Sequence, residues 1–192
     1  MQTQTKQLSI FAALALLMAA TRFNHFGSAV ALPDASLAVF FLGGFYLAQQ
    51  ARLGMLMFAA LLALAGGMDY YATSVGGVSD WCITPAYSFL IPTYAVLWFG
   101  GRWFAQHQQR GWLNLGVFAA SAAVATTLAF LISNLSFYLL SGYFPAMGAA
   151  EYAHSVAQYY LPYLSSAAVY LAGAAVVHGL LTRRSGLPVV HG

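Results

Sequence analysis

Cys82 is the only cysteine in the sequence, and it lies in a polar stretch, Asp69–Tyr87, that also contains Asp80 and a Thr84-Pro85 pair. A lone thiol cannot form an internal disulfide, and in an oxidising compartment it is a liability unless it is buried or used. Threonine followed by proline is typical of a helix N-terminus. We therefore expect Cys82 just before a helix, where the helix dipole favours the thiolate unless Asp80 lies close.

Other side chains suited to ligand binding occur near Cys82 and in a later aromatic stretch. They are a carboxylate, two tyrosines, a tryptophan, an amide and a histidine: Asp69, Tyr87, Tyr143, Trp81, Asn134 and His25. We rank His25 below Cys82 as a metal donor, because a lone histidine near a helix end is more often a capping or surface residue. Cys82, Asp69 and Tyr87 thus place a soft donor, a carboxylate and a phenol close together in the sequence.

Several familiar chemistries are disfavoured by the same residues. A structural zinc or iron–sulfur site needs several cysteine or histidine ligands, whereas this chain has one cysteine and no histidines at ligand spacing. A thiol oxidoreductase normally uses a Cys-x-x-Cys motif, which is absent. An intramembrane serine protease would need a positioned Ser–His pair, and His178 has no serine motif beside it. The apolar segments are almost free of charge, which argues against a proton relay or an ion pore.

The composition indicates the class of protein that must position these groups. Of 192 residues, 61% are hydrophobic and 6% are charged, which excludes a soluble globular domain, a disordered chain and a nucleic-acid-binding module. The apolar runs are continuous rather than alternating, so we predict membrane-spanning helices.

We predict an all-α bundle of six transmembrane helices in a single domain, residues 1–184, followed by a short tail, residues 185–192. A helix needs about 20 residues to cross a bilayer. The predicted spans are Leu8–Thr21, Ala35–Gln50, Leu53–Met68, Ala86–Gly101, Leu113–Leu131 and Leu161–Leu181. The first segment, preceded by Lys6 and followed by Ala19-Ala20, also fits a signal peptide, which is the less favoured interpretation.

Basic residues predict the orientation. With both termini in the cytoplasm, six of the seven Lys and Arg residues lie inside, and Arg22 is the exception. All four carboxylates and nine of the twelve tyrosines then fall on the outer side. An aromatic belt does not favour one leaflet so strongly, so the tyrosine excess suggests a large amphipathic ligand bound at the outer face.

The size, the six helices and the outward site resemble the substrate-binding S-components of energy-coupling-factor (ECF) vitamin transporters, and within them the cobalamin-specific BtuM family. The resemblance rests on Asp69, the segment 81–87 (WCITPAY), and the aromatic stretch around Ser133-Asn134 and 143–145. It implies binding and uptake of cobalamin across the bacterial cytoplasmic membrane, with Cys82 as an axial ligand to cobalt. It also implies a partnership with an ECF energising module. Many S-components dock to this module through pairs of small residues spaced four apart on the first helix, and here that helix offers only Ser9…Ala13 and Ala15…Ala19.

Soft thiolate is a suitable ligand for a polarizable metal centre, so the cobalt hypothesis is chemically sound. Ligation by a strong donor weakens the bond on the opposite axial side, which predicts decyanation of cyanocobalamin and leaves open whether the protein is an enzyme. Two alternatives stay open. One is an S-component-like carrier of another small ligand with a structural cysteine, and the other is a membrane enzyme that uses Cys82 as a nucleophile.

Overall fold

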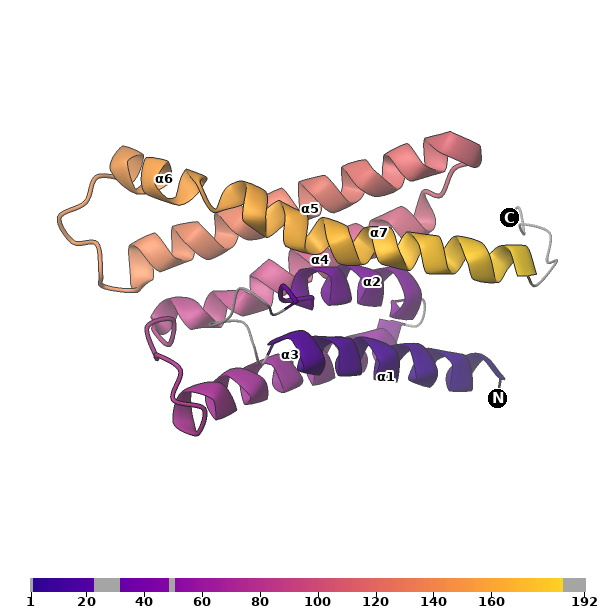
Figure 1. The fold of residues 1–192 in the computed structure, drawn as a ribbon, viewed down its shortest axis with the longest axis horizontal. Helices are drawn as coiled ribbons and strands as arrows, with labels where there is room; N and C mark the ends of the chain where they lie inside the picture. The colour runs from indigo at the N-terminus through magenta and orange to yellow at the C-terminus, as the bar shows by residue number, and fades with distance from the viewer. Residues whose placement is uncertain (1, 23–31, 49–50, 185–192) are drawn as a thin grey trace.

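The structure, a computed structural model, describes residues 2–22, 32–48 and 51–184; these residues form helices and connecting loops, with no strand among them (Figure 1). The elements are α1 (Gln2–Arg22), α2 (Ser36–Leu47), α3 (Ala51–Ser74), η1 (Pro85–Phe89), α4 (Leu90–Gln106), α5 (Gly111–Leu140), α6 (Ala149–Ala157) and α7 (Tyr160–Arg184). The predicted all-α class is confirmed.

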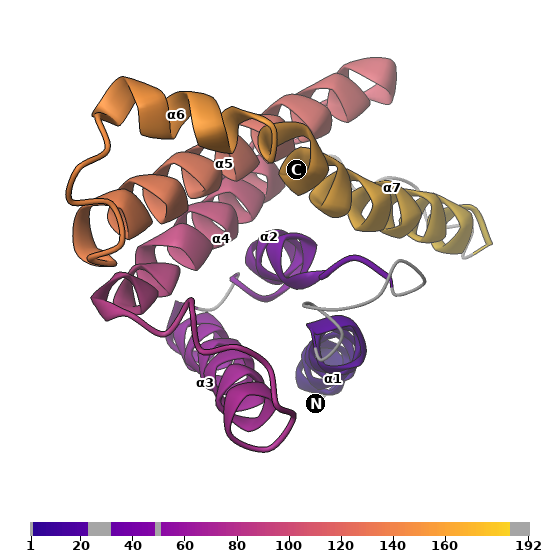
Figure 2. The ribbon, with the colours of Figure 1, turned by 60° about the vertical axis from the view of Figure 1, so that its left-hand side comes forward.

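Helix α2 forms the centre of the molecule. It has 12 residues, none of them charged, and ten of them are buried. Figure 2 shows α2 surrounded by α1, α3, α4 and α7. Its aromatic side chains pack in both directions: the Phe40 ring stacks on Tyr94 of α4 with centroids 4.1 Å apart, and Phe41 meets Phe118 of α5 edge to face at 5.8 Å. The core therefore lies around α2 rather than between longer helices.

Two glycine pairs let the backbones of α2 and α4 touch. A Cβ atom added at Gly44 would lie 1.8 Å from the Trp98 carbonyl oxygen, and one added at Gly101 would lie 1.8 Å from the Phe41 carbonyl oxygen. Both distances are far below any van der Waals contact, so only glycine fits at these positions. This close approach fixes α4, together with η1 before it, against α2.

The described chain contains three helices long and apolar enough to cross a membrane: α3, α5 and the Tyr160–Leu181 part of α7. Their outward faces carry exposed large apolar side chains, such as Leu128 and Leu135 of α5 and Val169 and Leu180 of α7. Large apolar surfaces of this kind are typical of a membrane protein. Helix α2 is apolar but too short to meet the same criterion.

The two ends of the molecule differ. Helix α1 begins and α7 ends at the right of Figure 1, while α6 and the loops at 75–84 and 141–148 lie at the left. We call the left end the Cys82 end. Helix α3 ends there at Ser74. In the turn that follows, Gly77 adopts a positive φ of 68°, and the Val78 amide donates to the Ala72 carbonyl. Only glycine adopts such a backbone without strain, so this turn ends the helix sharply.

Each of the six predicted segments contains a helix among the described residues, but the bounds differ from those predicted. Gln49, Gln50 and the predicted tail, residues 185–192, lie outside the described residues. Helices α3 and α5 extend to Ser74 and Leu140, beyond the predicted ends, because hydropathy marks the apolar part of a helix and not its polar final turns. Helix α6 was not predicted at all. It is short and amphipathic, and Tyr152 attaches it to α5 by donating to the Asn134 carbonyl at 3.2 Å.

Candidate binding pocket at the Cys82 end

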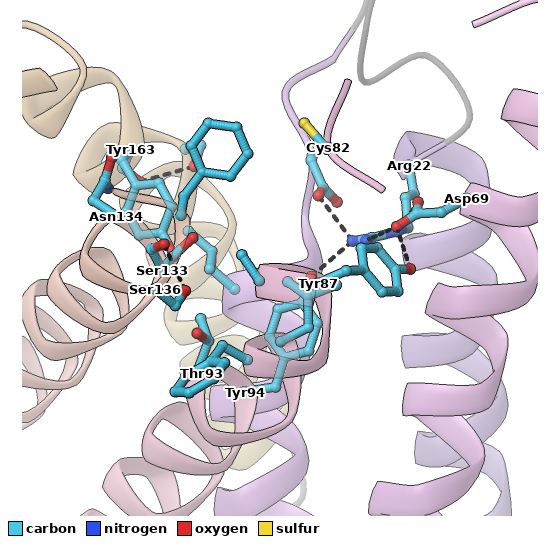
Figure 3. A pocket seen from close by; sticks show the side chains of 17 residues that line it. Arg22, Asp69, Cys82, Tyr87, Thr93, Tyr94, Ser133, Asn134, Ser136 and Tyr163 are labelled. Atoms are coloured by element: carbon cyan, nitrogen blue, oxygen red, sulfur yellow. Dashed lines mark hydrogen bonds and ion pairs between the residues drawn. The ribbon is translucent and has the colours of Figure 1, made fainter. Parts of the chain in front are cut away.

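A cavity of about 350 Å³ opens between the helices at the Cys82 end. Figure 3 shows polar side chains on its two opposite walls. The charged wall comes from α1, the segment just before α2, α3, the 75–84 loop and η1, and the neutral wall comes from α5 and α7. Residues of the charged wall are Arg22, Asp34, Asp69, Cys82 and Tyr87; residues of the neutral wall are Ser133, Asn134, Ser136, Tyr163 and Ser166, with Thr93 and Tyr94 of α4 at the base.

Arg22 organises the charged wall. Its side chain is only 6% exposed and forms a two-bond contact with Asp69, from Nε to Oδ1 at 2.7 Å and from Nη2 to Oδ2 at 2.6 Å. The remaining nitrogen, Nη1, lies 3.3 Å from Asp34 Oδ2 and 2.8 Å from both Ser36 Oγ and Tyr94 Oη. One guanidinium therefore joins α1, α2, α3 and α4. Such planar, bidentate pairing is the geometry for which arginine is best suited.

The charge of this cluster does not cancel. Arg22 contributes one positive charge, while Asp34 and Asp69, which are 14% and 13% exposed, contribute one negative charge each. The sum is one negative charge on the charged wall of the pocket. Asp34 is fixed further by the start of α2, because the Ser36 amide and hydroxyl both donate to its Oδ1, at 2.9 and 2.6 Å.

Asp69 connects the cluster to the segment that carries the cysteine. Tyr87 Oη donates to Asp69 Oδ2 at 2.8 Å, and Tyr87 lies in η1, directly after the 75–84 loop. The predicted helix start is confirmed in position, since Thr84 is extended and Pro85 opens η1. It differs in detail. The helix begins as a 3-10 turn, and the Thr84 hydroxyl makes no capping bond and is buried without a partner in the described chain.

Cys82 lies at the rim of the pocket and is exposed. The expected bias toward the thiolate is wrong. Partial burial of the Cys82 thiol raises its pKa above the ordinary value, and the negative charge of Asp69 acts in the same direction. The thiolate is therefore less favoured at Cys82 than in an ordinary cysteine.

Trp81 and Tyr143 lie outside the lining of the cavity, although both were predicted to bind the ligand. Their rings stack on each other with centroids 3.8 Å apart and planes 4° from parallel. Phe137 of α5 lies beside both rings, at 6.3 and 5.9 Å. The stack joins the 75–84 loop to the 141–148 loop, and thereby connects the two sides of the pocket at its Cys82 end.

The structure thus brings four of the predicted binding residues to one cavity: Cys82, Asp69, Tyr87 and Asn134. His25 lies outside the described residues. Sequence analysis missed Arg22, which it treated as a loop charge in a bundle without internal charges. The signal was present, because Arg22 is the one basic residue that breaks the predicted charge asymmetry. Asp34 and Thr93 carried no comparable signal.

No group of three or more His, Cys, Asp or Glu side chains within the described residues is arranged to hold a metal ion. Cys82 by itself supplies one soft ligand, so it suits a metal that arrives with its other coordination positions already filled. Comparison with models of known protein families gives no match, and comparison with curated proteins gives none either.

Proposed function

We propose that this chain is a membrane protein of the BtuM type that binds cobalamin at the Cys82 end and carries it across the bacterial cytoplasmic membrane, with the Cys82 sulfur ligating cobalt. The observation that carries the proposal is one thiol at the rim of a polar cavity, without a group of further ligands in the described chain. A corrin ring fills four equatorial positions of cobalt, so a single protein donor on one axis is sufficient.

The chemistry at Cys82 is an exchange of axial ligands. The thiol loses its proton, and the sulfur lone pair forms the bond to cobalt in place of the displaced nucleotide base. Cyanide on the opposite axis then leaves with its bonding electron pair, and the oxidation state of cobalt does not change. Because the proton must be released, and because burial and Asp69 raise the pKa of the thiol, ligation weakens as the pH falls.

The proposed topology has six membrane-crossing helices with both termini in the cytoplasm. Arg102 lies near the end of α4, and Arg110 directly precedes α5. In Figure 1, α4 ends and α5 begins at the end of the bundle opposite the Cys82 end, which fits the positive-inside rule. Impermeant thiol labelling of intact cells, in a Cys82→Ala background, tests this orientation. A cysteine at position 76 should be labelled and one at position 110 should not; the opposite result refutes it.

An energy source for uptake is part of the proposal. The charged cluster lies at one end of the bundle, where Arg22 contacts both Asp34 and Asp69, so these residues form no chain of ionisable groups across the protein. We therefore propose uptake driven by an ECF module, or facilitated movement with trapping inside. Corrinoid uptake that follows an imposed ion gradient in liposomes containing only this protein would refute both.

The cavity is smaller than a whole corrinoid, since about 350 Å³ lies near the lower limit for small-ligand pockets. Binding of cobalamin therefore requires the 75–84 and 141–148 loops to separate, which breaks the Trp81–Tyr143 stack. The small volume is also the observation that favours the second candidate function, a carrier of a smaller vitamin-like ligand in which Cys82 is structural. The nucleophilic-enzyme alternative is disfavoured, because the described lining contains no histidine to activate a thiol of raised pKa.

The decisive experiment is the visible spectrum of purified protein incubated with cyanocobalamin. The wild type should show a shifted corrinoid spectrum and loss of bound cyanide. Cys82→Ser keeps the size but supplies a hard, rarely ionised oxygen, and should lose both signals. Asp69→Ala and Tyr87→Leu serve as matched controls, because they alter the charged wall without touching the sulfur, and should weaken binding while the shift remains. Unchanged spectrum and affinity in Cys82→Ser would assign the cysteine a structural role.

A further inference from the structure

Thr93, at the base of the pocket, has a hydroxyl group without a partner in the described part of the chain. The residue is 2% exposed. A threonine inside a helix commonly bonds to the carbonyl one turn earlier, yet Thr93 does not. Leaving a buried hydroxyl unpaired is unfavourable, so such groups are rare unless a ligand or water completes them.

The neutral wall above Thr93 offers more of the same chemistry. Figure 3 shows Ser133, Asn134, Ser136 and Tyr163 on one side of the pocket, opposite Cys82 and Arg22. Asn134 Nδ2 donates to the Phe130 carbonyl at 2.9 Å, so the acceptor oxygen of its amide is left for a ligand. Ser136 Oγ donates to the Ser133 carbonyl at 2.8 Å and keeps its acceptor capacity.

No positive charge in the described lining is available to a ligand. Arg22 is the lining residue with a permanent positive charge, and its three nitrogens already contact Asp69, Asp34, Ser36 and Tyr94. The pocket instead carries a net negative charge from its two carboxylates. A carboxylate on a ligand would thus meet like charge and would find no guanidinium or ammonium group to bind it.

We propose that the neutral wall, with Thr93 at its base, recognises uncharged carboxamide groups at the rim of the ligand, and that the pocket rejects ligands bearing a carboxylate there. A carboxamide both donates and accepts, which matches a surface of hydroxyl groups and an amide oxygen. A carboxylate only accepts, so it cannot use Asn134 Oδ1. This inference rests on the proposed function and specifies it: amidated corrinoids bind and their acid derivatives do not.

The test compares cyanocobalamin with its separated monocarboxylic acids, in which one peripheral carboxamide has become a carboxylate. Affinity for detergent-purified protein is measured by titration calorimetry at pH 7. We expect at least one acid to bind ten or more times weaker than cyanocobalamin. If every acid binds as tightly as cyanocobalamin, this inference fails while cobalamin binding stands. If neither cyanocobalamin nor any acid binds, both this inference and the proposed function fail.

Thr93→Val separates ligand recognition from stability. Valine has nearly the same shape, so loss of an unpaired hydroxyl should leave the ligand-free melting temperature unchanged or higher. Affinity for cyanocobalamin should fall several-fold. The difference in affinity between cyanocobalamin and the monocarboxylic acid that binds more weakly should narrow. The matched control is Ser121→Ala, outside the pocket, where Oγ donates to the Gly100 carbonyl at 3.0 Å. It should lower the melting temperature and leave the affinity ratio unchanged. A Thr93→Val protein that binds both ligands as the wild type does overturns the proposal, whatever its melting temperature.

Discussion

Replacing Arg22 with methionine should be among the most destabilising single substitutions in this protein. Methionine keeps the unbranched apolar stem but removes every bond to Asp69, Asp34, Ser36 and Tyr94. Two carboxylates that are 13% and 14% exposed would then face each other without a countercharge. Breaking a buried ion pair on one side costs about 3–5 kcal/mol. For a chain of this length that corresponds to a fall of roughly 6–20 °C in melting temperature.

The assay is thermal unfolding of detergent-purified protein, followed by a thiol-reactive dye or by circular dichroism. Arg110→Met is the matched control, because Arg110 is exposed and its loss should change stability by about 0.5 kcal/mol or less. Adding Asp69→Asn to Arg22→Met should recover part of the loss, since asparagine removes one uncompensated charge and still accepts from Tyr87. An Arg22→Met protein that melts within 2 °C of the wild type, with no rescue by Asp69→Asn, would refute the proposed role of the cluster.

Three further outcomes are expected from the packing of α2 against α4, the raised pKa of the Cys82 thiol and the Trp81–Tyr143 stack. Gly44→Ala should destabilise the fold by about 1–3 kcal/mol or more, because its Cβ would overlap the α4 backbone, whereas Gly116→Ala, with open space around it, should not destabilise it; thermal melting compares them. Alkylation of Cys82 in the ligand-free protein should reach half its maximal rate at a pH above the ordinary thiol value of about 8.5, since a raised pKa leaves less thiolate at any given pH; a plateau already at pH 8 would contradict this. Trp81→Ala should accelerate corrinoid association roughly two- to tenfold in stopped-flow measurements by removing the stack with Tyr143, and an unchanged rate would show that the loops do not limit access.

The sequence predicts features that depend on residues close together in the chain better than features that depend on contacts between distant segments. The helices follow from local apolar runs, so their existence and approximate position could be predicted, as could the helix start at Pro85. The pairing of Asp69 with Tyr87 was within reach, because both border the Cys82 loop. Recruitment of Ser133 and Tyr163 to the same cavity depends on how α5 and α7 cross α4, which no local pattern encodes.

The errors have similar physical causes. The state of the Cys82 thiol was predicted from helix polarity with Asp80 as the opposing charge, whereas partial burial and the nearby charge of Asp69 decide the direction of its pKa. Arg22 was assigned to the outer side of the membrane from the predicted topology, in which it is the one basic residue outside. Its burial is possible only because two carboxylates, from segments 12 and 47 residues away, converge on it.

The brevity of α2 has a consequence for the electrical profile of the protein in a bilayer. At 1.5 Å per residue, its 12 residues span about 18 Å, well short of the roughly 30 Å hydrocarbon core. The cavity begins where α2 begins, since Asp34 and Leu37 line it. In the proposed six-span topology, the pocket replaces part of the membrane thickness, and α2 forms a thin barrier beneath it. Most of a transmembrane voltage would then fall across α2, so a ligand bound at Cys82 would have entered part of the bilayer depth while remaining close to the potential of the side it came from.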